Sequence, residues 1–184
     1  MRILGVDPGL TRCGVGVIDA RADRTVVLVD VLVIQTSPTF DLPLRLLELR
    51  TRLGAVIDEF APDRVAVERV FAQHNLRTVM GTAQASGIAF VEAAARNIPV
   101  DLHTPSEVKA SITGTGRANK LQVASMVSRL LSLPEEKYLP DATDALALAI
   151  CNAWRGSSSA ALPQALTPAQ RRWREAERQA KKSL

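Results

Sequence analysis

Four acidic residues interrupt apolar segments of this chain, and their types and positions suggest metal-ion chemistry. Asp7 and Glu68 each end a short apolar run, and Asp141 and Asp144 open an Ala- and Leu-rich stretch that extends to Ile150. A carboxylate buried among aliphatic side chains carries a large desolvation cost unless a cation compensates it. Because like charges cannot neutralise one another, we expect bound cations, and carboxylate oxygens suit hard divalent ions such as Mg²⁺ or Mn²⁺.

Such a set of carboxylates is typical of two-metal phosphodiester hydrolysis. Two divalent ions about 3.5–4 Å apart clamp the attacking and leaving oxygens and lower the pKa of a water molecule. One bridging carboxylate with a few flanking ones is a reasonable ligand set for them. Taken singly, each acid has a simpler explanation as a helix cap or a surface charge, but four acids in this pattern are harder to explain in that way.

The elements that must position these acids are predicted by hydrophobic periodicity and turn residues. Thr104 and Glu107 match a capping box, which indicates a helix start, and Asp41 is the expected N-cap of an earlier helix. Gly14 and Gly16 allow another backbone to approach closely. We therefore expect an α/β domain with a mixed sheet. The expected strands are 2–7, 14–19, 25–35, 64–68 and 98–102, and the expected helices are about 41–60, 75–97, 104–113, 119–131 and 141–154.

The same periodicity predicts where the four acids point. Alternation places Asp7 and Glu68 on defined faces of their strands, so the two carboxylates meet at one sheet edge if these strands are neighbours. Asp141 and Asp144 are three residues apart and project from the same face of a helix. Both are expected in its first turn, where the helix dipole favours anions. The rest of that helix is apolar nearly all round, which indicates burial.

Length and composition indicate one ordinary globular domain. The chain has 184 residues, of which 47% are hydrophobic and 23% charged, and no apolar run approaches the roughly 20 residues of a membrane span. No signal-peptide segment is visible at the N-terminus. Cys13 and Cys151 lack metal-ligand spacing, so we expect reduced core residues of a cytoplasmic protein with no membrane association. The isolated His74 and His103 are expected to be structural or surface groups.

The surplus of positive charge lies at the C-terminal end. The net charge is +4, and the segment from Pro168 onward holds six basic and two acidic residues, so the remaining body is formally neutral. A serine-rich stretch after Gly156 is typical of a flexible linker. We therefore expect a folded domain at 1–155 and a linker with a basic tail at 156–184. The tail is either a solvated extension or a sequence-independent contact to nucleic-acid phosphates.

Three motifs, in order along the chain, resemble the RuvC family of crossover-junction endodeoxyribonucleases. The motifs are Gly5-Val6-Asp7-Pro8-Gly9, Val67-Glu68-Arg69-Val70-Phe71 with Asn75, and Asp141-Ala142-Thr143-Asp144-Ala145-Leu146-Ala147. The resemblance covers most of the chain before the serine-rich stretch. It implies a ribonuclease-H-like fold with a five-stranded mixed sheet flanked by helices. It also implies Mg²⁺-dependent paired nicking of four-way (Holliday) DNA junctions by a homodimer, during recombination and DNA repair.

The resemblance further implies roles for the four acids and for partners. Asp7, Glu68, Asp141 and Asp144 match the family's metal-binding acids. On this basis Asp7 would bridge two Mg²⁺ ions, with Mn²⁺ as an alternative, and the other three acids would complete their shells. The family also implies cooperation with the branch-migration proteins RuvA and RuvB. The small residues at 81–87 would form either a dimer surface or a packing surface within one chain.

Basic and aromatic residues complete the expected site. Lys109 and Lys120 match residues implicated in DNA contact and catalysis, and Arg117 would help them to position phosphates. Phe71 matches an aromatic residue that stacks on unpaired bases near the crossover. Core packing for Phe71 and helix-surface charge for the lysines are the alternatives. His74 stands at a position where relatives often carry Lys.

Three other functions compete with this hypothesis. A sugar-kinase or actin-like ATPase would share the phosphate loop after Asp7, but it needs a second, similar domain for which this chain has no room. A non-catalytic junction-binding protein would gain nothing from buried carboxylates, which repel DNA unless metal ions are bound. A ribonuclease-H-like nuclease of another specificity would keep the same acids. Nicking assays on junctions, duplexes and RNA·DNA hybrids, with and without Mg²⁺, separate these functions.

Overall fold

A five-stranded mixed sheet forms the centre of the molecule, as predicted. The computed structural model describes residues 1–69, 76–133 and 140–155. The strand order is β3-β2-β1-β4-β5, with β1, β2 and β3 antiparallel and with β4 and β5 parallel to β1. The elements are β1 (Arg2–Asp7), β2 (Arg12–Ala20), β3 (Val26–Gln35), α1 (Leu42–Phe60), β4 (Arg64–Glu68), α2 (Leu76–Ala94), β5 (Val100–His103), α3 (Pro105–Thr113), α4 (Lys120–Leu130) and α5 (Pro140–Arg155).

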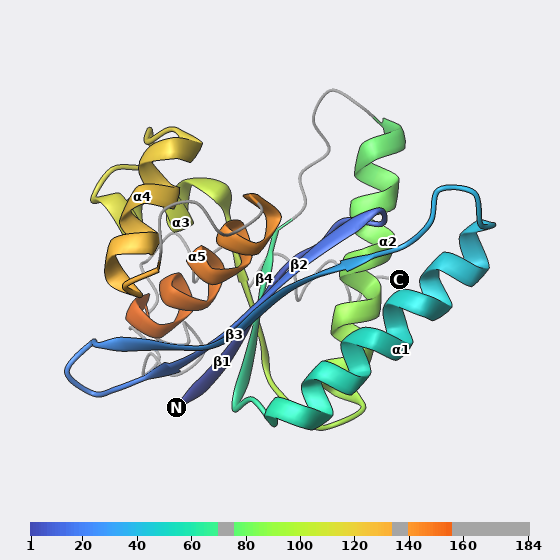
Figure 1. Cartoon of the computed structure of the whole chain (residues 1–184), viewed down its shortest axis with the longest axis horizontal. Coiled ribbons are helices and arrows are strands. Elements are labelled where there is room, and N and C mark those ends of the chain that lie inside the picture. The colour runs from blue at the N-terminus through green and yellow to red at the C-terminus, as the bar shows by residue number, and fades with distance from the viewer. Residues whose placement is uncertain (70–75, 134–139, 156–184) are drawn as a thin grey trace, which may run out of the picture.

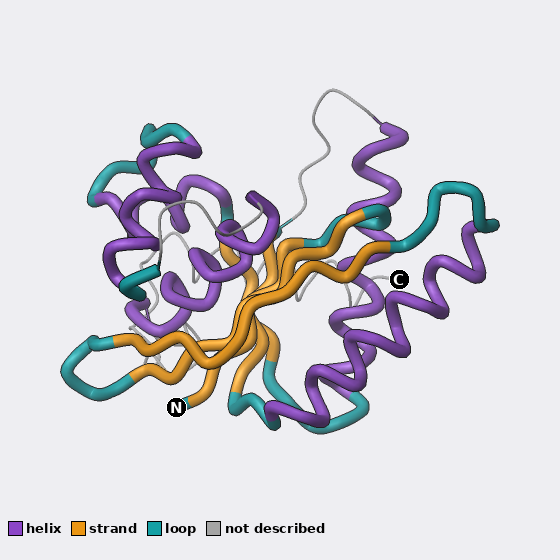
Figure 2. The backbone as a smooth tube through the Cα atoms, viewed as in Figure 1, coloured by secondary structure: helices purple, strands orange, loops and turns teal. Residues whose placement is uncertain are grey.

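Two groups of helices cover the two faces of the sheet (Figure 1). Figure 2 shows the strands as one layer between these groups. On β1, Ile3 joins the apolar cluster that is completed by α3, α4 and α5. Leu4 and Val6 join the opposite cluster, which contains residues of α1 and α2. The alternation predicted for the first strand is therefore confirmed, and it leaves Asp7 at the strand end on the α5 side.

Glycines allow α5 to lie directly on β1 and β2. A Cβ atom at Gly5 would overlap the carbonyl oxygen of Ala145, and one at Gly14 would overlap the carbonyl oxygen of Asp141. A Cβ atom at Gly16 would also meet α5. The close backbone approach predicted at Gly14 and Gly16 is confirmed. Because Gly14 lies beneath the backbone of Asp141, it sets the height of the acid-bearing end of α5 above the sheet.

Local signals placed most element ends correctly. The capping box at α3 is present, because the Thr104 hydroxyl accepts from the Glu107 backbone N–H at 3.2 Å and the Glu107 carboxylate accepts from the Thr104 backbone N–H at 2.8 Å. Asp41 is the N-cap residue of α1, but its side chain makes no capping hydrogen bond. Strand β5 runs from Val100 to His103, so it begins and ends later than the expected strand at 98–102. It reaches His103 because its pairing with β4 extends to the position opposite Glu68.

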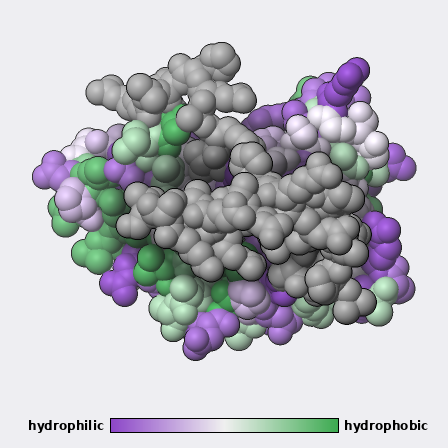
Figure 3. Space-filling view, turned by 180° about the vertical axis from the view of Figure 1, so that it is seen from behind, coloured by the Kyte–Doolittle hydropathy of each residue, from purple (hydrophilic) through white to green (hydrophobic). Residues whose placement is uncertain are grey.

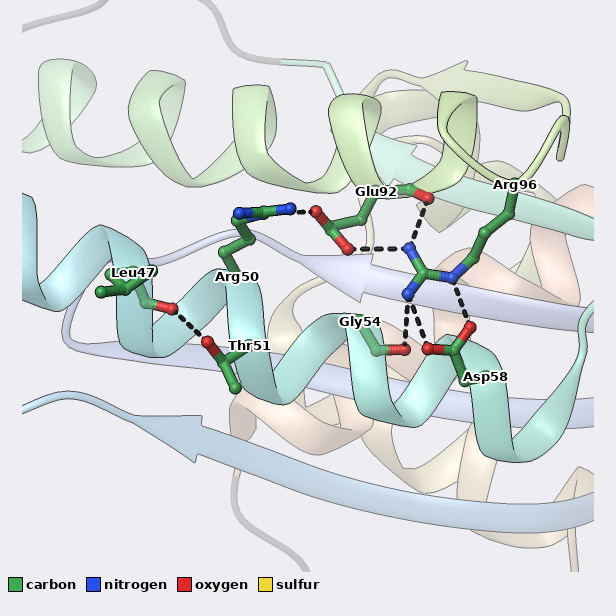
Figure 4. A network of polar contacts seen from close by, with 7 residues as sticks. All are labelled: Leu47, Arg50, Thr51, Gly54, Asp58, Glu92 and Arg96. Carbon is green, nitrogen blue, oxygen red and sulfur yellow. Dashed lines mark hydrogen bonds and ion pairs between the residues drawn. The ribbon is translucent and has the colours of Figure 1, made fainter.

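Helices α1 and α2 are joined by a charged network away from the acid-bearing helix (Figure 4). The buried Glu92 carboxylate accepts from Arg50 at 2.9 Å and from Arg96 at 2.7 Å, and Arg96 also reaches Asp58. Burial by itself raises the pKa of Glu92, but the hydrogen bonds from the two arginines outweigh this effect and lower the pKa below its ordinary value. The network therefore requires an ionised carboxylate, and it stabilises the packing of α1 against α2.

Exposed apolar side chains remain on α1 and α2. Leu44 and Leu47 on α1, and Met80 and Val91 on α2, are each more than half exposed. Viewed from behind, hydrophobic side chains gather at the left, which is the side of α1 (Figure 3). None of the described helices is long and apolar enough to cross a membrane. The expected linker and basic tail at 156–184 lie outside the described residues.

Candidate active site

The ends of β1 and β4 open into a cavity of about 200 Å³. Parallel pairing aligns Val6 with Val67, so Asp7 and Glu68 follow at neighbouring strand ends. Both acids line the cavity. We call this cavity the acidic pocket; its charged lining residues are Asp7, Glu68, Asp144, Lys109 and Lys120, and its apolar lining comes from α3, α4 and α5.

Helix α5 supplies one acid to the pocket and places the other beside it. Asp144 lines the acidic pocket, and its Oδ2 lies 2.8 Å from the Nζ atom of Lys120. Asp141 lies in the first turn of α5 and is not among the lining residues. Its Oδ2 lies instead 2.9 Å from the Nε atom of Arg12. The structure therefore brings three of the four predicted acids into one cavity and pairs the fourth with an arginine at its edge.

The acids of the pocket strongly affect one another. Burial, followed by the negative charges of Glu68, Asp144 and Asp141, raises the pKa of Asp7 to about 7, against the opposing charge of Lys120. Burial and the charge of Asp144 also raise the pKa of Glu68. The hydrogen bond to Asp144 raises the pKa of Lys120. The two lysines of the pocket therefore do not fully offset the burial and mutual repulsion of its acids.

The donor chemistry of the pocket fits a hard divalent ion. Three carboxylates from three elements meet there, and a divalent cation would relieve the repulsion that raises the pKa of Asp7. Across residues 1–69, 76–133 and 140–155, however, no three acidic, histidine or cysteine side chains converge closely enough to hold a metal ion. In this arrangement Oδ2 of Asp144 is directed towards Lys120 and Oδ2 of Asp141 towards Arg12.

The predicted DNA-contacting residues are placed differently from one another. Lys109 on α3 and Lys120 at the start of α4 line the acidic pocket. Arg117 is exposed in the loop between these helices and does not line the pocket. Phe71 and His74 lie outside the described residues. The second expected histidine, His103, is buried and its Nε2 lies 3.0 Å from Oδ1 of Asn152, so it is a structural group.

Arg12 lies at the edge of the site although no motif in the sequence predicted it. Arg12 is the first residue of β2, and the antiparallel pairing of β2 with β1 brings the start of β2 beside Asp7. A signal was present, because the Pro8-Gly9 turn after Asp7 returns the chain to the same edge of the sheet within a few residues. The pairing with Asp141 could not be foreseen, since it depends on how α5 packs against β2.

Comparisons with known proteins agree on one family. The family model described as "Crossover junction endodeoxyribonuclease RuvC" matches residues 3–152. A protein of that name from Leifsonia xyli is 56% identical, over 97% of this chain and 92% of its own length. Another from Clavibacter sepedonicus is 60% identical, over 88% of this chain and 79% of its own length.

Solved structures agree with the sequence comparisons. The RuvC of T. thermophilus in complex with a Holliday junction substrate superposes with a TM-score of 0.80 at 32% identity, covering 84% of this chain and 94% of that chain. The yeast mitochondrial Holliday junction resolvase Ydc2 superposes with a TM-score of 0.60 at 15% identity, covering 82% of this chain and 78% of that chain, and this likeness concerns the fold alone. The predicted ribonuclease-H-like arrangement of a mixed sheet between helices is confirmed.

Proposed function

Because the chain belongs to the RuvC family of crossover junction endodeoxyribonucleases, we propose that the acidic pocket is the place where it cuts four-way junction DNA. The enzyme is a metal-dependent nuclease that resolves Holliday junctions in recombination and DNA repair. Its membership in this family removes the sugar-kinase and actin-like alternative. The observation that carries the assignment of the site is the convergence of Asp7, Glu68 and Asp144 with Lys109 and Lys120 in one cavity.

The acids of the pocket are proposed to hold two Mg²⁺ ions. Asp7 would be the central ligand, because its carboxylate interacts with the charges of Glu68 and of both acids of α5. Glu68, Asp144 and Asp141 complete the ligand set, the last after it leaves Arg12. Divalent ions held by these residues, Mg²⁺ or alternatively Mn²⁺, would stabilise charge on phosphate oxygens and make water more acidic.

The basic residues are proposed to position the DNA backbone. Lys109 and Lys120 face the acidic pocket, where each can contact a phosphate oxygen next to the scissile bond. The positive charge of Lys120 becomes available to phosphate once Asp144 turns to a metal ion. Arg117, which is exposed on the adjoining loop, is proposed to contact a more distant phosphate. Base stacking by Phe71 is also proposed, on the resemblance alone.

A nicking assay tests the proposed function. Purified protein is incubated with a four-way junction, with the linear duplex of the same sequence and with an RNA·DNA hybrid, each in Mg²⁺ and in EDTA. We expect nicks in the junction alone, in Mg²⁺ alone, at symmetric positions on two strands. Cleavage of the hybrid at an equal rate would identify a nuclease of another specificity. Junction binding without nicking in Mg²⁺ or Mn²⁺ would identify a non-catalytic binding protein.

Paired nicks need two equivalent sites, and we propose that a two-fold dimer supplies them. The small residues Ala85 and Ser86 are buried within the chain, so this part of the 81–87 segment packs internally. The opposite face of α2 carries Met80, Phe90 and Val91, which are 58%, 37% and 59% exposed. Met80 and Val91 lie on the same side of the helix, with Phe90 about a quarter of a turn away, and this exposed side of α2 is the proposed dimer surface. Cooperation with RuvA and RuvB, and a cytoplasmic location, are proposed from the family alone.

A charge on this surface is expected to separate the subunits. The variant Val91→Asp would bury a carboxylate in an apolar interface, which costs several kcal/mol and weakens dimerisation by at least about 100-fold. Sedimentation velocity at micromolar concentration should show a monomer for this variant and a dimer for the wild type. Leu121→Asp, which changes an exposed leucine on α4, is the matched control and should remain dimeric. A monomeric wild-type enzyme with full activity would contradict the proposed dimer.

A further inference from the structure

The ion pair between Arg12 and Asp141 keeps one predicted metal ligand outside the acidic pocket. The Arg12 Nε atom lies 2.9 Å from Asp141 Oδ2, and the two side chains are 61% and 23% exposed. Asp141 remains close enough to the pocket for its charge to contribute to the raised pKa of Asp7. The Asp141 carboxylate therefore lies at the edge of the pocket and is directed towards a cation of the chain itself.

The backbones beneath this ion pair are held firmly, whereas the arginine side chain is not. Arg12 pairs with Gln35 at the start of β2, and the carbonyl oxygen of Asp141 packs directly against Gly14. The guanidinium extends from this frame into solvent. Because the backbone of Asp141 is held against Gly14, an exchange of its partner would have to come from rotation of the Asp141 side chain.

The strength of the ion pair suits an exchangeable contact. A pair in which the arginine is mostly exposed is screened by water and contributes little to stability. The network of Arg96 is different, because that guanidinium bonds to both Glu92 and Asp58 and is itself mostly covered. A divalent ion beside several carboxylates competes easily with a single exposed guanidinium. The ion pair with Arg12 is thus strong enough to orient Asp141 without a metal ion and weak enough to be broken by one.

We propose that Arg12 is a temporary counter-ion of Asp141. Without bound metal ions it holds the Asp141 carboxylate away from the acidic pocket, and when metal ions bind it is displaced and Asp141 is released. This inference rests on the proposed metal site. Once released, the Arg12 guanidinium lies exposed at the edge of the pocket, where it is available to a phosphate of the junction. Arg12 is therefore a positioning residue for Asp141 and one of the links between metal binding and DNA binding.

Metal affinity measured without DNA tests this proposal. Isothermal titration of Mn²⁺ is compared for the wild type, Arg12→Gln and Arg12→Lys. Because the glutamine variant has no ion pair to displace, we expect its Mn²⁺ dissociation constant to fall about three- to fivefold. The lysine variant keeps the charge and should lie between the two. Arg52→Gln is the matched control, because Arg52 also pairs with an acid, Glu48, but on α1. It should bind Mn²⁺ like the wild type.

A second measurement follows the guanidinium directly. The ¹⁵N–¹H signal of the Arg12 Nε–H group, identified by its loss in Arg12→Gln, should shift during Mg²⁺ titration at the same concentrations that saturate the site. An unchanged signal at saturation, or unchanged or weaker Mn²⁺ binding by Arg12→Gln, would overturn the proposal. Weaker binding would show that Arg12 prepares Asp141 as a ligand. If the wild type bound no Mn²⁺, the proposed metal site would fail instead, so the two failures are distinguishable.

Discussion

Replacing Asp7 with asparagine is expected to abolish junction nicking and, at the same time, to make the metal-free enzyme more stable. Asp7 is the proposed bridging ligand. Loss of residues that merely orient metal ligands already costs about 10- to 100-fold in activity, so loss of a direct ligand should cost at least about 100-fold. Junction binding should persist, because removal of a negative charge does not weaken attraction to DNA phosphates.

The stability gain follows from the raised pKa of Asp7. Folding raises this pKa from 3.8 to about 7, so the folded state binds a proton more tightly than the unfolded state does. The stability associated with the protonated carboxyl is complete below pH 3.8 and is lost as the pH rises through about 7. Asparagine carries no charge and avoids this loss. Above pH 7 the variant should therefore be more stable than the wild type, by up to about 4 kcal/mol.

Thermal unfolding in EDTA between pH 5 and 9 measures this effect, and a nicking assay in Mg²⁺ measures the loss of activity. The advantage of Asp7→Asn should grow with pH. Glu92→Gln is the matched control, because Glu92 is also buried but has a lowered pKa and two arginine partners. This control should destabilise the protein and leave nicking unchanged. Wild-type nicking by Asp7→Asn would refute the site, and a less stable variant at pH 9 would refute the electrostatic argument.

Adding one methyl group at Gly14, which lies under the acid-bearing end of α5, is expected to reduce both nicking activity and stability. The Cβ atom of Gly14→Ala would overlap the carbonyl oxygen of Asp141, so the start of α5 must move away from the sheet. Overpacking of this kind costs about 1–3 kcal/mol. A displacement of about 1 Å in the acids of α5 would lower the nicking rate roughly 100-fold. Chemical denaturation and single-turnover nicking measure the two losses.

The control for this variant is Gly81→Ala. A Cβ atom at Gly81 would only touch Leu10 at 3.5 Å, which is an ordinary contact. Because alanine favours a helix over glycine by up to about 1 kcal/mol, this variant should be as stable as the wild type or slightly more so. Full activity and stability of Gly14→Ala would show that α5 is not held at the close distance on which the site depends.

The two charged pairs of α5 explain how the chain tolerates its acids before any metal ion binds. Lys120 compensates Asp144 inside the acidic pocket, and Arg12 compensates Asp141 at its edge. Among the residues that the structure describes, no ion pair involves Asp7, and its pKa is raised to about 7. Divalent ions and DNA phosphates would redistribute these partners, because the ions attract the carboxylates while the phosphates attract the basic side chains.

Much of the fold could be predicted from local sequence. The strands that carry Asp7 and Glu68 follow from β-branched runs, and the faces of Ile3, Leu4 and Val6 follow from a side-chain period of two. The start of α3 follows from its capping box. These features are local, because each depends on residues a few positions apart. The four acids stood out for the same reason, since each interrupts an apolar segment.

The sequence by itself determined the acid set, the element order and the glycines over which α5 could approach the sheet. Only the tertiary structure decided which cation each acid faces. Arg12 and Asp141 are far apart in the chain, and their contact depends on the packing of α5 over Gly14 and on side-chain rotamers that no local pattern encodes. The same is true of Lys120 and Asp144, whose pairing requires α4 and α5 to meet beside the strand ends. The interaction between two charges depends on their distance in space, so the partner of each acid can be assigned only when the fold is known.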